Sequence, residues 1–306
     1  MVFKKLLGAL GVGGPTVDTV LSTPVVRPGG QIQGQVNLVG GKQDAEITGI
    51  TLTLVARVEI EHEEGESSGL SPFARFSVTP PLRLAEGEQR SVPFSVQLPH
   101  EAPITVFDGW QPHGMAVGVR TEVEIAGARD KGDADPLGIA PLPVQERVLQ
   151  AFTALGFRLH SADLEAGHIR GSAQSLPFYQ EIEYAVPSPY SHLGRMAEIT
   201  FVTTPQQVEV VLEFDKRHGD VINRHLLDHS AAEHDLTPVV EDWLRHAVSS
   251  SHGHGYGGHG HGGAGVAAGV AAGAVAGVVG GLVLEELVED VVEDVFEDAV
   301  EDFFED

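Results

Sequence analysis

Apolar and polar residues alternate along much of the first 128 residues. Between Ile50 and Ile60 every even-numbered position is apolar. This pattern predicts a β-strand with one buried face, because successive side chains point to opposite sides of a strand. Residues 32–38, 92–98 and 115–125 alternate in the same way, and turn-forming glycines and prolines separate the runs. Regularly spaced strands without a long helix between them favour an antiparallel β-sandwich over residues 1–128.

Residues 129–247 combine helical and strand periodicities. Apolar residues recur at helical spacing over 143–155, and Gly156 follows as a helix-ending residue. Strand patterns follow at 178–186, 196–203 and 207–214, and a second helix is expected over 237–248. The chain is therefore predicted to be mainly β, with a second β-sandwich, carrying a few short helices, over residues 129–247.

The remaining residues form three segments of low complexity. Residues 248–263 are a linker rich in glycine and histidine, and residues 264–284 are uncharged and almost entirely Ala, Gly and Val. Residues 285–306, the acidic segment, alternate pairs of acids with pairs of apolar residues and hold twelve acids and no base. Like charges four residues apart weaken a helix. We interpret this segment as an amphipathic docking tail, the alternative being a tail that only keeps the chain soluble.

A glycine occurs at every fourth position across residues 264–284: Gly265, Gly269, Gly273, Gly277 and Gly281. On a helix these glycines form a smooth ridge that lets a second helix approach closely. A helix of this length spans about 31 Å, close to the thickness of a bilayer core. Glycine lowers helix propensity, however, and Ala gives little hydrophobic drive. The segment is a candidate membrane anchor or self-association helix, with a plain linker as the alternative.

The formal charge of −25 argues against binding to nucleic acid, because the chain repels phosphate. Cysteine is absent, which excludes disulfides, zinc–thiolate sites and a cysteine nucleophile, and fits a cytoplasmic protein.

Near the start, Phe3, Leu6, Leu7 and Leu10 recur at helical spacing, and their apolar run is shorter than a secretory signal requires. We expect a short amphipathic helix there that packs on the first sandwich or touches a membrane surface.

Two motifs suggest chemistry but fit other structures better. Residues 65–69 read Gly-Glu-Ser-Ser-Gly, the spacing of a hydrolase nucleophile elbow. Because an acidic stretch precedes them and Ser-Pro follows shortly, we expect a polar loop.

Asp130, Asp133 and Asp135 occur within one short predicted loop. They can contribute to a calcium site, which needs more oxygens than three carboxylates offer, or form turn hydrogen bonds at a domain junction.

Histidines supply two candidate metal sites. His225 and His229 are four residues apart, with His234 beyond, and would share a face if the stretch were helical, as a zinc site requires. Histidines that only form hydrogen bonds are the alternative. In the Gly-rich linker, His252, His254, His259 and His261 can gather weakly around Ni²⁺, Cu²⁺ or Zn²⁺. Neither set predicts a catalytic residue or a resident cofactor.

The order of several short segments carries a resemblance to a known family. These segments are Thr16–Leu21, Arg27–Val36, Arg120–Ile125, Arg129–Pro136, Leu155–Leu159 and Val210–Arg217. Together they resemble the bacterial sporulation-control family, sporulation stage-zero protein M. The resemblance implies an arrestin-like fold of two β-sandwiches and a role in regulating development. It implies no catalytic residues, and it does not extend past about residue 248.

Three hypotheses about function follow. The first is a non-catalytic regulatory scaffold or adaptor, whose sandwich surfaces bind protein partners and whose tail docks, self-associates or anchors. The second is a membrane-associated envelope or stress protein held by residues 264–284. The third, a metal-dependent or hydrolytic enzyme, has no motif in the context that its chemistry needs.

Overall fold

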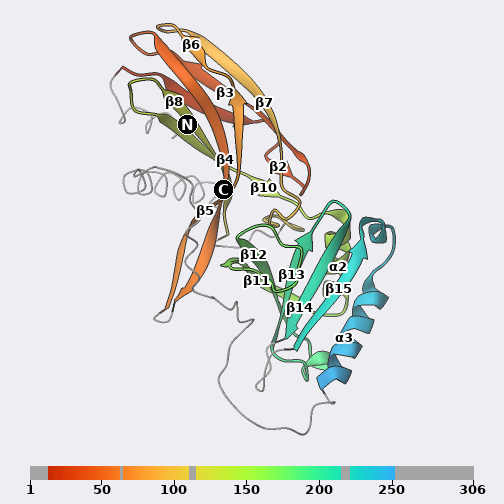
Figure 1. The fold of residues 1–306 in the computed structure, drawn as a ribbon. Helices are drawn as coiled ribbons and strands as arrows, with labels where there is room; N and C mark the ends of the chain where they lie inside the picture. Colours follow the sequence, from red (N-terminus) through yellow and green to blue (C-terminus); the bar gives the residue numbers. More distant parts are fainter. Residues whose placement is uncertain (1–12, 63–64, 110–114, 215–220, 252–306) are drawn as a thin grey trace.

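The computed structural model describes residues 13–62, 65–109, 115–214 and 221–251 (Figure 1). Two parts follow each other along the chain, an N-terminal part up to about residue 142 and a C-terminal part from residue 143. The prediction of a mainly β chain with a few short helices is confirmed. Whether the chain contains two arrestin-like sandwiches stays a prediction.

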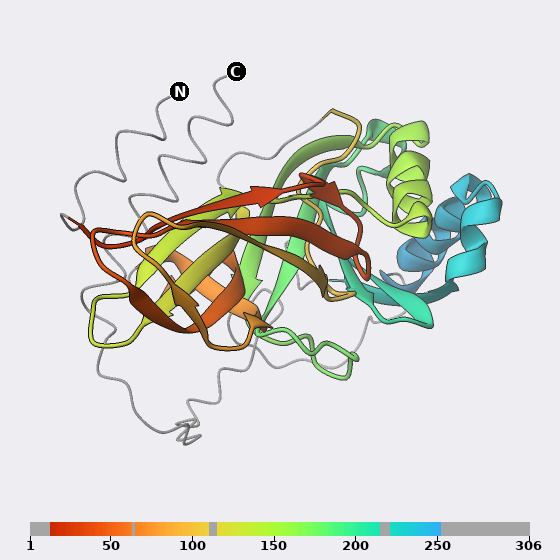
Figure 2. The same cartoon turned by 90° about the horizontal axis from the view of Figure 1, so that it is seen from above.

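One layer of the N-terminal part is a three-stranded antiparallel sheet of β1 (Thr16–Leu21), β3 (Gln31–Val39) and β7 (Gln89–Gln97), in the order β1-β3-β7. The alternation seen in the sequence appears here as burial. Ile32, Val36 and Leu38 on β3 are almost completely buried, as is Gly34, whereas the residues that alternate with them are exposed or half-buried. The buried side chains face the second layer, which Figure 2 shows behind β1 and β3.

The second layer is built around the long strand β4 (Ala45–His62). Its antiparallel neighbours are β5 (Gly65–Thr79), β6 (Leu82–Leu84) and β8 (Val117–Ile125), and β8 pairs in turn with β9 (Lys131–Pro136). A short parallel pair, β2 (Val25–Val26) with β10 (Gly138–Ile139), closes one end. The predicted boundary after residue 128 therefore falls between two paired strands of this layer.

Residues 65–69, expected to be a polar loop, belong to β5, so that prediction is wrong. Gly65 to Gly69 pair with Val58 to His62 of β4, and β5 continues to Thr79 without a helix after it. The strand-to-helix turn that a nucleophile elbow requires is therefore not formed at this motif. Backbone pairing with a long neighbouring strand overrides the weak strand propensity of Gly and Ser.

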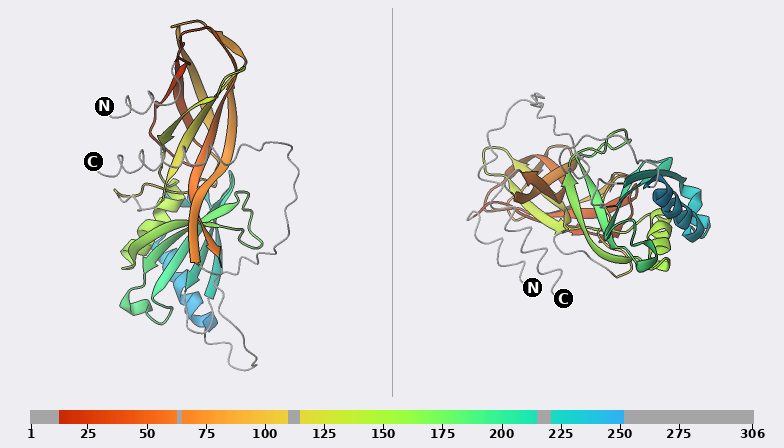
Figure 3. Two further views of the ribbon diagram at one scale, coloured as in Figure 1. Left: turned by 90° about the vertical axis from the view of Figure 1, so that its left-hand side faces the viewer. Right: turned by 90° about the horizontal axis from the view of Figure 1, so that it is seen from below.

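The C-terminal part has five antiparallel strands in chain order, which we call the C-terminal sheet. They are β11 (Arg158–Ala166), β12 (Phe178–Ala185), β13 (Met196–Thr203), β14 (Gln207–Phe214) and β15 (Val221–Asp228). The helices α2 (Pro143–Ala154) and α3 (Thr237–Ser251) lie together over one face of this sheet (Figure 3). Two 3-10 turns, η1 (Ser188–Tyr190) and η2 (His229–Glu233), complete the part. Both helices and the strands at 178, 196 and 207 were predicted.

The helix α2 is fixed by aromatic packing. Phe152 on α2 contacts the ring of Phe157 edge-on, with 5.1 Å between ring centroids, and also contacts Tyr184 of β12 at 5.7 Å. All three side chains are almost fully buried. The helix ends before Gly156, whose φ of 91° is one that L-residues rarely adopt. This turn places Phe157 back under the helix.

The two parts share one continuous sheet. β11 pairs in parallel with the far end of β4 at Glu165 and Glu59, which gives the strand order β15-β14-β13-β12-β11-β4-β8-β9. Phe73 of β5 also contacts Phe178 of β12 edge-on at 5.6 Å. The β4–β5 hairpin is thus the structural link between the N-terminal and C-terminal parts.

A buried polar contact joins the two layers of the N-terminal part where β1 meets β8 and β9. The hydroxyl groups of Thr19 and Thr121 are 2.7 Å apart, and both residues are buried. The backbone N–H of Thr19 donates to the Asp133 carboxylate at 2.5 Å. Side chains of the second layer therefore form hydrogen bonds with polar groups of β1 that are not used in the pairing of β1 with β3.

We predict that Thr121→Val lowers the free energy of unfolding by about 1–3 kcal/mol, because it leaves the buried Thr19 hydroxyl without its partner. Urea unfolding monitored by circular dichroism measures this change. The double variant Thr19→Val/Thr121→Val is the control, since it leaves no unpaired hydroxyl and should lose less stability than Thr121→Val alone. If the double variant is the less stable of the two, the hydroxyl pair does not join the layers in the way described.

Candidate interaction face of the C-terminal sheet

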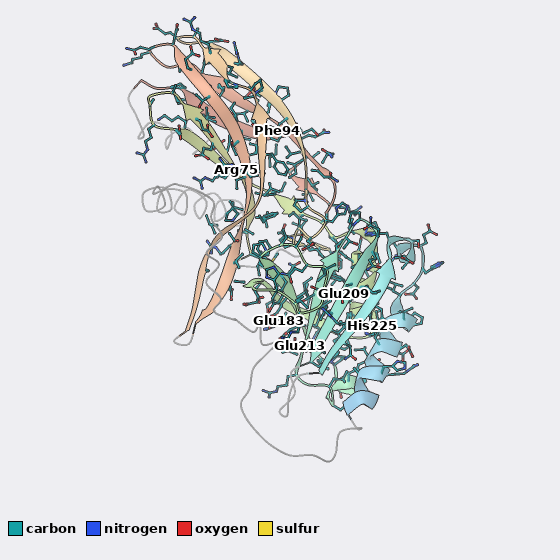
Figure 4. The ribbon with its side chains drawn as sticks, viewed as in Figure 1. Arg75, Phe94, Glu183, Glu209, Glu213 and His225 are labelled. Carbon is teal, nitrogen blue, oxygen red and sulfur yellow. The ribbon has the colours of Figure 1, made fainter. Side chains whose placement is uncertain are left out.

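The two faces of the C-terminal sheet differ sharply in chemistry. The face under the helices is apolar, with Leu164, Ile182, Ile199, Val210 and Leu212 almost completely buried. The opposite face, which we call the acidic face, carries acids on four adjacent strands: Asp163, Glu165, Glu181, Glu183, Glu198, Glu209 and Glu213. Figure 4 labels Glu183, Glu209 and Glu213 on this sheet.

Strand register places these acids directly opposite one another. Asp163 pairs with Glu181, Glu183 with Glu198, and Glu198 with Glu213. Directly opposed residues of antiparallel strands have Cβ atoms about 4.5–5.5 Å apart, and like charges at that distance destabilise the sheet. The acidic face therefore favours whatever reduces its charge, whether a proton, a cation or a basic side chain.

Glu181 shows the effect of this like-charge repulsion most clearly. Burial raises the pKa of its carboxyl, and the neighbouring charges of Glu198 and Asp163 raise it further, to about 9. Glu181 is therefore protonated at neutral pH. The uncharged Glu181 carboxyl lowers the like-charge repulsion across the middle of the acidic face. A cationic ligand that binds there can displace its proton.

Asp163, Glu165 and Glu181 form the group that can hold a metal ion among the residues that the structure describes. One carboxylate oxygen from each lies within 4.8 Å of the others. Oxygen ligands of this kind suit Ca²⁺ or Mg²⁺, but three carboxylates supply fewer ligands than Ca²⁺ takes, so water or a further group would have to complete the coordination shell.

The β15 side of the acidic face is mixed in character. Arg224 of β15 forms an ion pair with Glu209 at 3.1 Å. Its neighbours on the same face, Ile222 and Leu226, are 47% and 63% exposed, high values for large apolar side chains. Within the described residues β15 pairs only with β14, so it is an edge strand. An exposed apolar edge strand is a surface onto which another chain can add a strand.

The histidines considered as a zinc pair do not share a helical face, because the stretch is not an α-helix. His225 lies on β15 and stacks on Trp243 of α3, with 4.2 Å between the rings and 8° between their planes. Burial lowers the pKa of His225, as does the nearby His246. His229 lies in η2, where a ring nitrogen is 2.9 Å from the carbonyl oxygen of Thr204, and His234 is exposed beyond it. The helix that a zinc pair would need is therefore not formed, and His229 forms a hydrogen bond, as the alternative expected.

The three aspartates at 130–135 do not share a loop. Asp130 accepts a hydrogen bond from the backbone N–H of Ile125 at the β8–β9 turn, as the turn alternative predicted. Asp133 and Asp135 lie in β9 itself. Burial raises the pKa of Asp135 to about 8, helped by the charges of Asp133 and Asp18. The three carboxylates do not approach each other closely enough to form a candidate metal group.

Several sequence predictions lie outside the described residues. These are the amphipathic helix at Phe3–Leu10, the histidines His252, His254, His259 and His261, the glycine ridge Gly265–Gly281 and the acidic segment. Their structures and any metal, membrane or self-association role stay predictions. Among the residues that the structure does describe, no helix is long and apolar enough to cross a membrane.

Comparison with known proteins decides the family. The family model described as "SpoOM protein" matches residues 3–218, well over half of the chain. The chain belongs to the SpoOM protein family.

Two relatives support this assignment and bear on function. The "Sporulation-control protein spo0M" of Bacillus subtilis (strain 168) is 34% identical over 216 residues, covering 70% of this chain and 81% of the relative. The crystal structure of Spo0M from the same species is similar, with a TM-score of 0.69 and 29% identity, over 77% of this chain and all of that one. The resemblance seen in the sequence is confirmed, and the family relationship supports a regulatory role.

The acidic face was not predicted from the sequence, although its local signal is visible there. Asp163-Leu-Glu165 and Glu181-Ile-Glu183 each place two acids on one side of a strand and an apolar residue on the other. What the local pattern lacks is the register between strands. Only that register shows that Asp163 faces Glu181 and that Glu183 faces Glu198.

We predict that Glu181→Gln stabilises the protein increasingly as pH rises from 5 to 9. Across this window the folded state keeps a proton on Glu181, with its pKa of about 9, while the unfolded state has lost it, so stability falls with rising pH. Glutamine removes this dependence. Chemical denaturation at pH 5, 7 and 9 measures the change, with Glu233→Gln, at an exposed glutamate of η2, as the control. Equal effects of Glu181→Gln at all three pH values would contradict the assignment.

Proposed function

We propose that this SpoOM family member is a non-catalytic regulatory adaptor that binds an extended segment of a protein partner along β15. The observation that carries the proposal is the combination on this strand of an open edge with two exposed apolar side chains, Ile222 and Leu226. The relative from Bacillus subtilis bears the name of a sporulation-control protein, which suits an adaptor in a developmental pathway.

The backbone of an edge strand supplies most of the affinity in such a complex. Its outward N–H and C=O groups can pair with a partner strand, and alternate side chains then supply specificity. Here the alternate residues on the acidic side are Ile222, Arg224 and Leu226. A partner strand would therefore find two apolar contacts flanking a charged residue that is already paired with Glu209.

The charge of the face next to β15 selects the partner. A segment that pairs with β15 directs its side chains on one side toward the acidic face, where Glu209 and Glu213 lie on the adjacent strand β14. Lysine or arginine there would reduce the like-charge repulsion described above. We therefore expect a partner segment that alternates apolar and basic residues, and we expect its binding to weaken as salt rises.

Site-specific photocrosslinking in the native host tests this proposal. A photoreactive amino acid at Leu226 should yield discrete protein adducts that mass spectrometry identifies, because Leu226 is the more exposed of the two proposed apolar contacts. The matched control places the same amino acid at Val239, an apolar residue of α3 that is 38% exposed but away from the strand edge. Ile222→Lys, which replaces the second apolar contact, should reduce the adducts at position 226 several-fold.

Two results would contradict the proposal. One is the absence of protein adducts from position 226, and the other is a set of adducts at position 226 identical to the set at position 239. Thermal unfolding of Ile222→Lys shows whether the variant is folded. We expect little change in its stability, because the replaced side chain is already about half exposed.

A further inference from the structure

The loop that joins β11 to β12, residues 167–177, is held together by one glutamine. The side-chain oxygen of Gln174 accepts a hydrogen bond from the backbone N–H of Ile169 at 2.8 Å. Its amide nitrogen donates to the carbonyl oxygens of Gly167 and Leu176 at 2.8 and 2.9 Å. Because one side chain satisfies backbone groups at both ends of the loop, the loop has a defined shape without a helix or strand of its own.

The base of this loop is anchored to the N-terminal part. Glu101, in the connection between β7 and β8, accepts hydrogen bonds from the backbone N–H groups of Ser175 and Leu176 at 2.7 and 3.1 Å. The hydroxyl of Ser175 donates to the same carboxylate at 2.8 Å. Hydrogen bonds to a carboxylate are stronger than those between neutral groups. The direction in which the loop leaves the sheet is therefore fixed at its base.

The tip of the loop contacts Arg224 of β15. Gly171 has a φ of 76°, a turn conformation that favours glycine, and a Cβ atom at this position would lie 3.4 Å from Nη1 of Arg224. The guanidinium therefore packs beside the backbone of the tip. The strands β13 and β14 separate β12 from β15, a distance of about 14 Å at 4.8 Å for each strand. The contact between the loop tip and Arg224 thus bridges part of the acidic face.

Arg224 is also the base that neutralises this side of the acidic face. Its Nε lies 3.1 Å from the Glu209 carboxylate, and the two side chains are 32% and 15% exposed. Salt screens a partly buried pair of this kind less than it screens an exposed one. The proposed function places a lysine or arginine of the partner beside Glu209. Arg224 already occupies that position in the free protein.

We propose that Arg224 is an internal ligand of the acidic face, held by the tip of the 167–177 loop and displaced by a basic side chain of the partner. This inference rests on the proposed function, because it concerns the same strand edge and the same face. While Arg224 pairs with Glu209, the partner's base must compete for that carboxylate. Once the guanidinium is displaced it leaves Gly171, and the loop tip loses its contact with β15. Partner binding at β15 is therefore coupled to release of the loop.

Limited trypsin digestion of the folded full-length protein tests the contact without any partner. Arg170 is exposed at the loop tip, and cleavage after it requires the tip to open locally. Arg224→Gln removes the charge that holds the guanidinium on Glu209, and it should speed cleavage between Arg170 and Gly171 several-fold. Arg195→Gln, at an exposed arginine directly before β13, is the matched control and should leave this rate unchanged.

A second variant tests whether the ion pair and the loop act as one unit. Glu209→Gln removes the other half of the pair and should speed the same cleavage to a similar extent. The double variant Arg224→Gln/Glu209→Gln should be cleaved no faster than either single variant, because both changes remove one shared interaction. Chemical denaturation of each variant shows that the difference arises from the loop and not from loss of the fold.

Photocrosslinking from position 226 tests the competition itself. Arg224→Gln should raise the yield of protein adducts several-fold, because Glu209 then has no internal base. Glu209→Gln should lower the yield, because the carboxylate that attracts the partner's base is gone. Two variants that open the loop alike are therefore expected to change partner binding in opposite directions.

The outcomes separate this inference from the proposed function. Equal cleavage in Arg224→Gln and the parent protein would overturn the contact, even with adducts at position 226. Faster cleavage with an adduct yield that Arg224→Gln does not raise would overturn the competition. Faster cleavage with no adducts in any variant would sink the proposed function, and displacement by a partner with it, while the contact between Arg224 and the loop would stand.

Discussion

The architecture depends on one strand that both parts of the molecule share. β4 runs for 18 residues and pairs with β5 along most of its length, with β6 and β8 in the N-terminal part, and with β11 near its far end. A one-residue slip of a strand moves every side chain to the other face. The register of β4 therefore fixes which residues enter the N-terminal core, and it also positions β11, where the acidic face begins. Register irregularities near Ile47, Ile50 and Leu54 bend and twist so long a strand without losing its pairing.

Local pattern was sufficient for the central part of β4 and for α2, in which one face is buried and the other is exposed to solvent. The even-numbered apolar positions from Ile50 to Ile60 predict the central part of β4, and the helical spacing at 143–155 predicts α2, because in both cases burial against a single core imposes the periodicity. β5 shows where this reasoning fails. Its first residues are Gly, Glu and Ser, which favour loops by themselves, and only the long β4 beside them makes a strand the better conformation.

The candidate functional surfaces were harder to predict than the fold, for the same physical reason. His225 and His229 have the spacing of a helical metal pair, yet β15 is a strand, and the aromatic stack on Trp243 fixes His225 against α3 instead. The acidic face requires three successive strand registers before its opposed acids can be seen. Such sets are defined by pairing between distant segments, which a single sequence does not display.

Charge alone does not give the acidic face, on which Figure 4 labels Glu209, a unique partner. A basic partner segment is attracted to the acidic face, but it is attracted equally to any other dense group of acids, and residues 285–306 hold twelve of them. Residues 285–306 would therefore compete with the acidic face for such a partner, so a segment that binds β15 must gain selectivity from its backbone pairing and from its contacts with Ile222 and Leu226 as well as from charge.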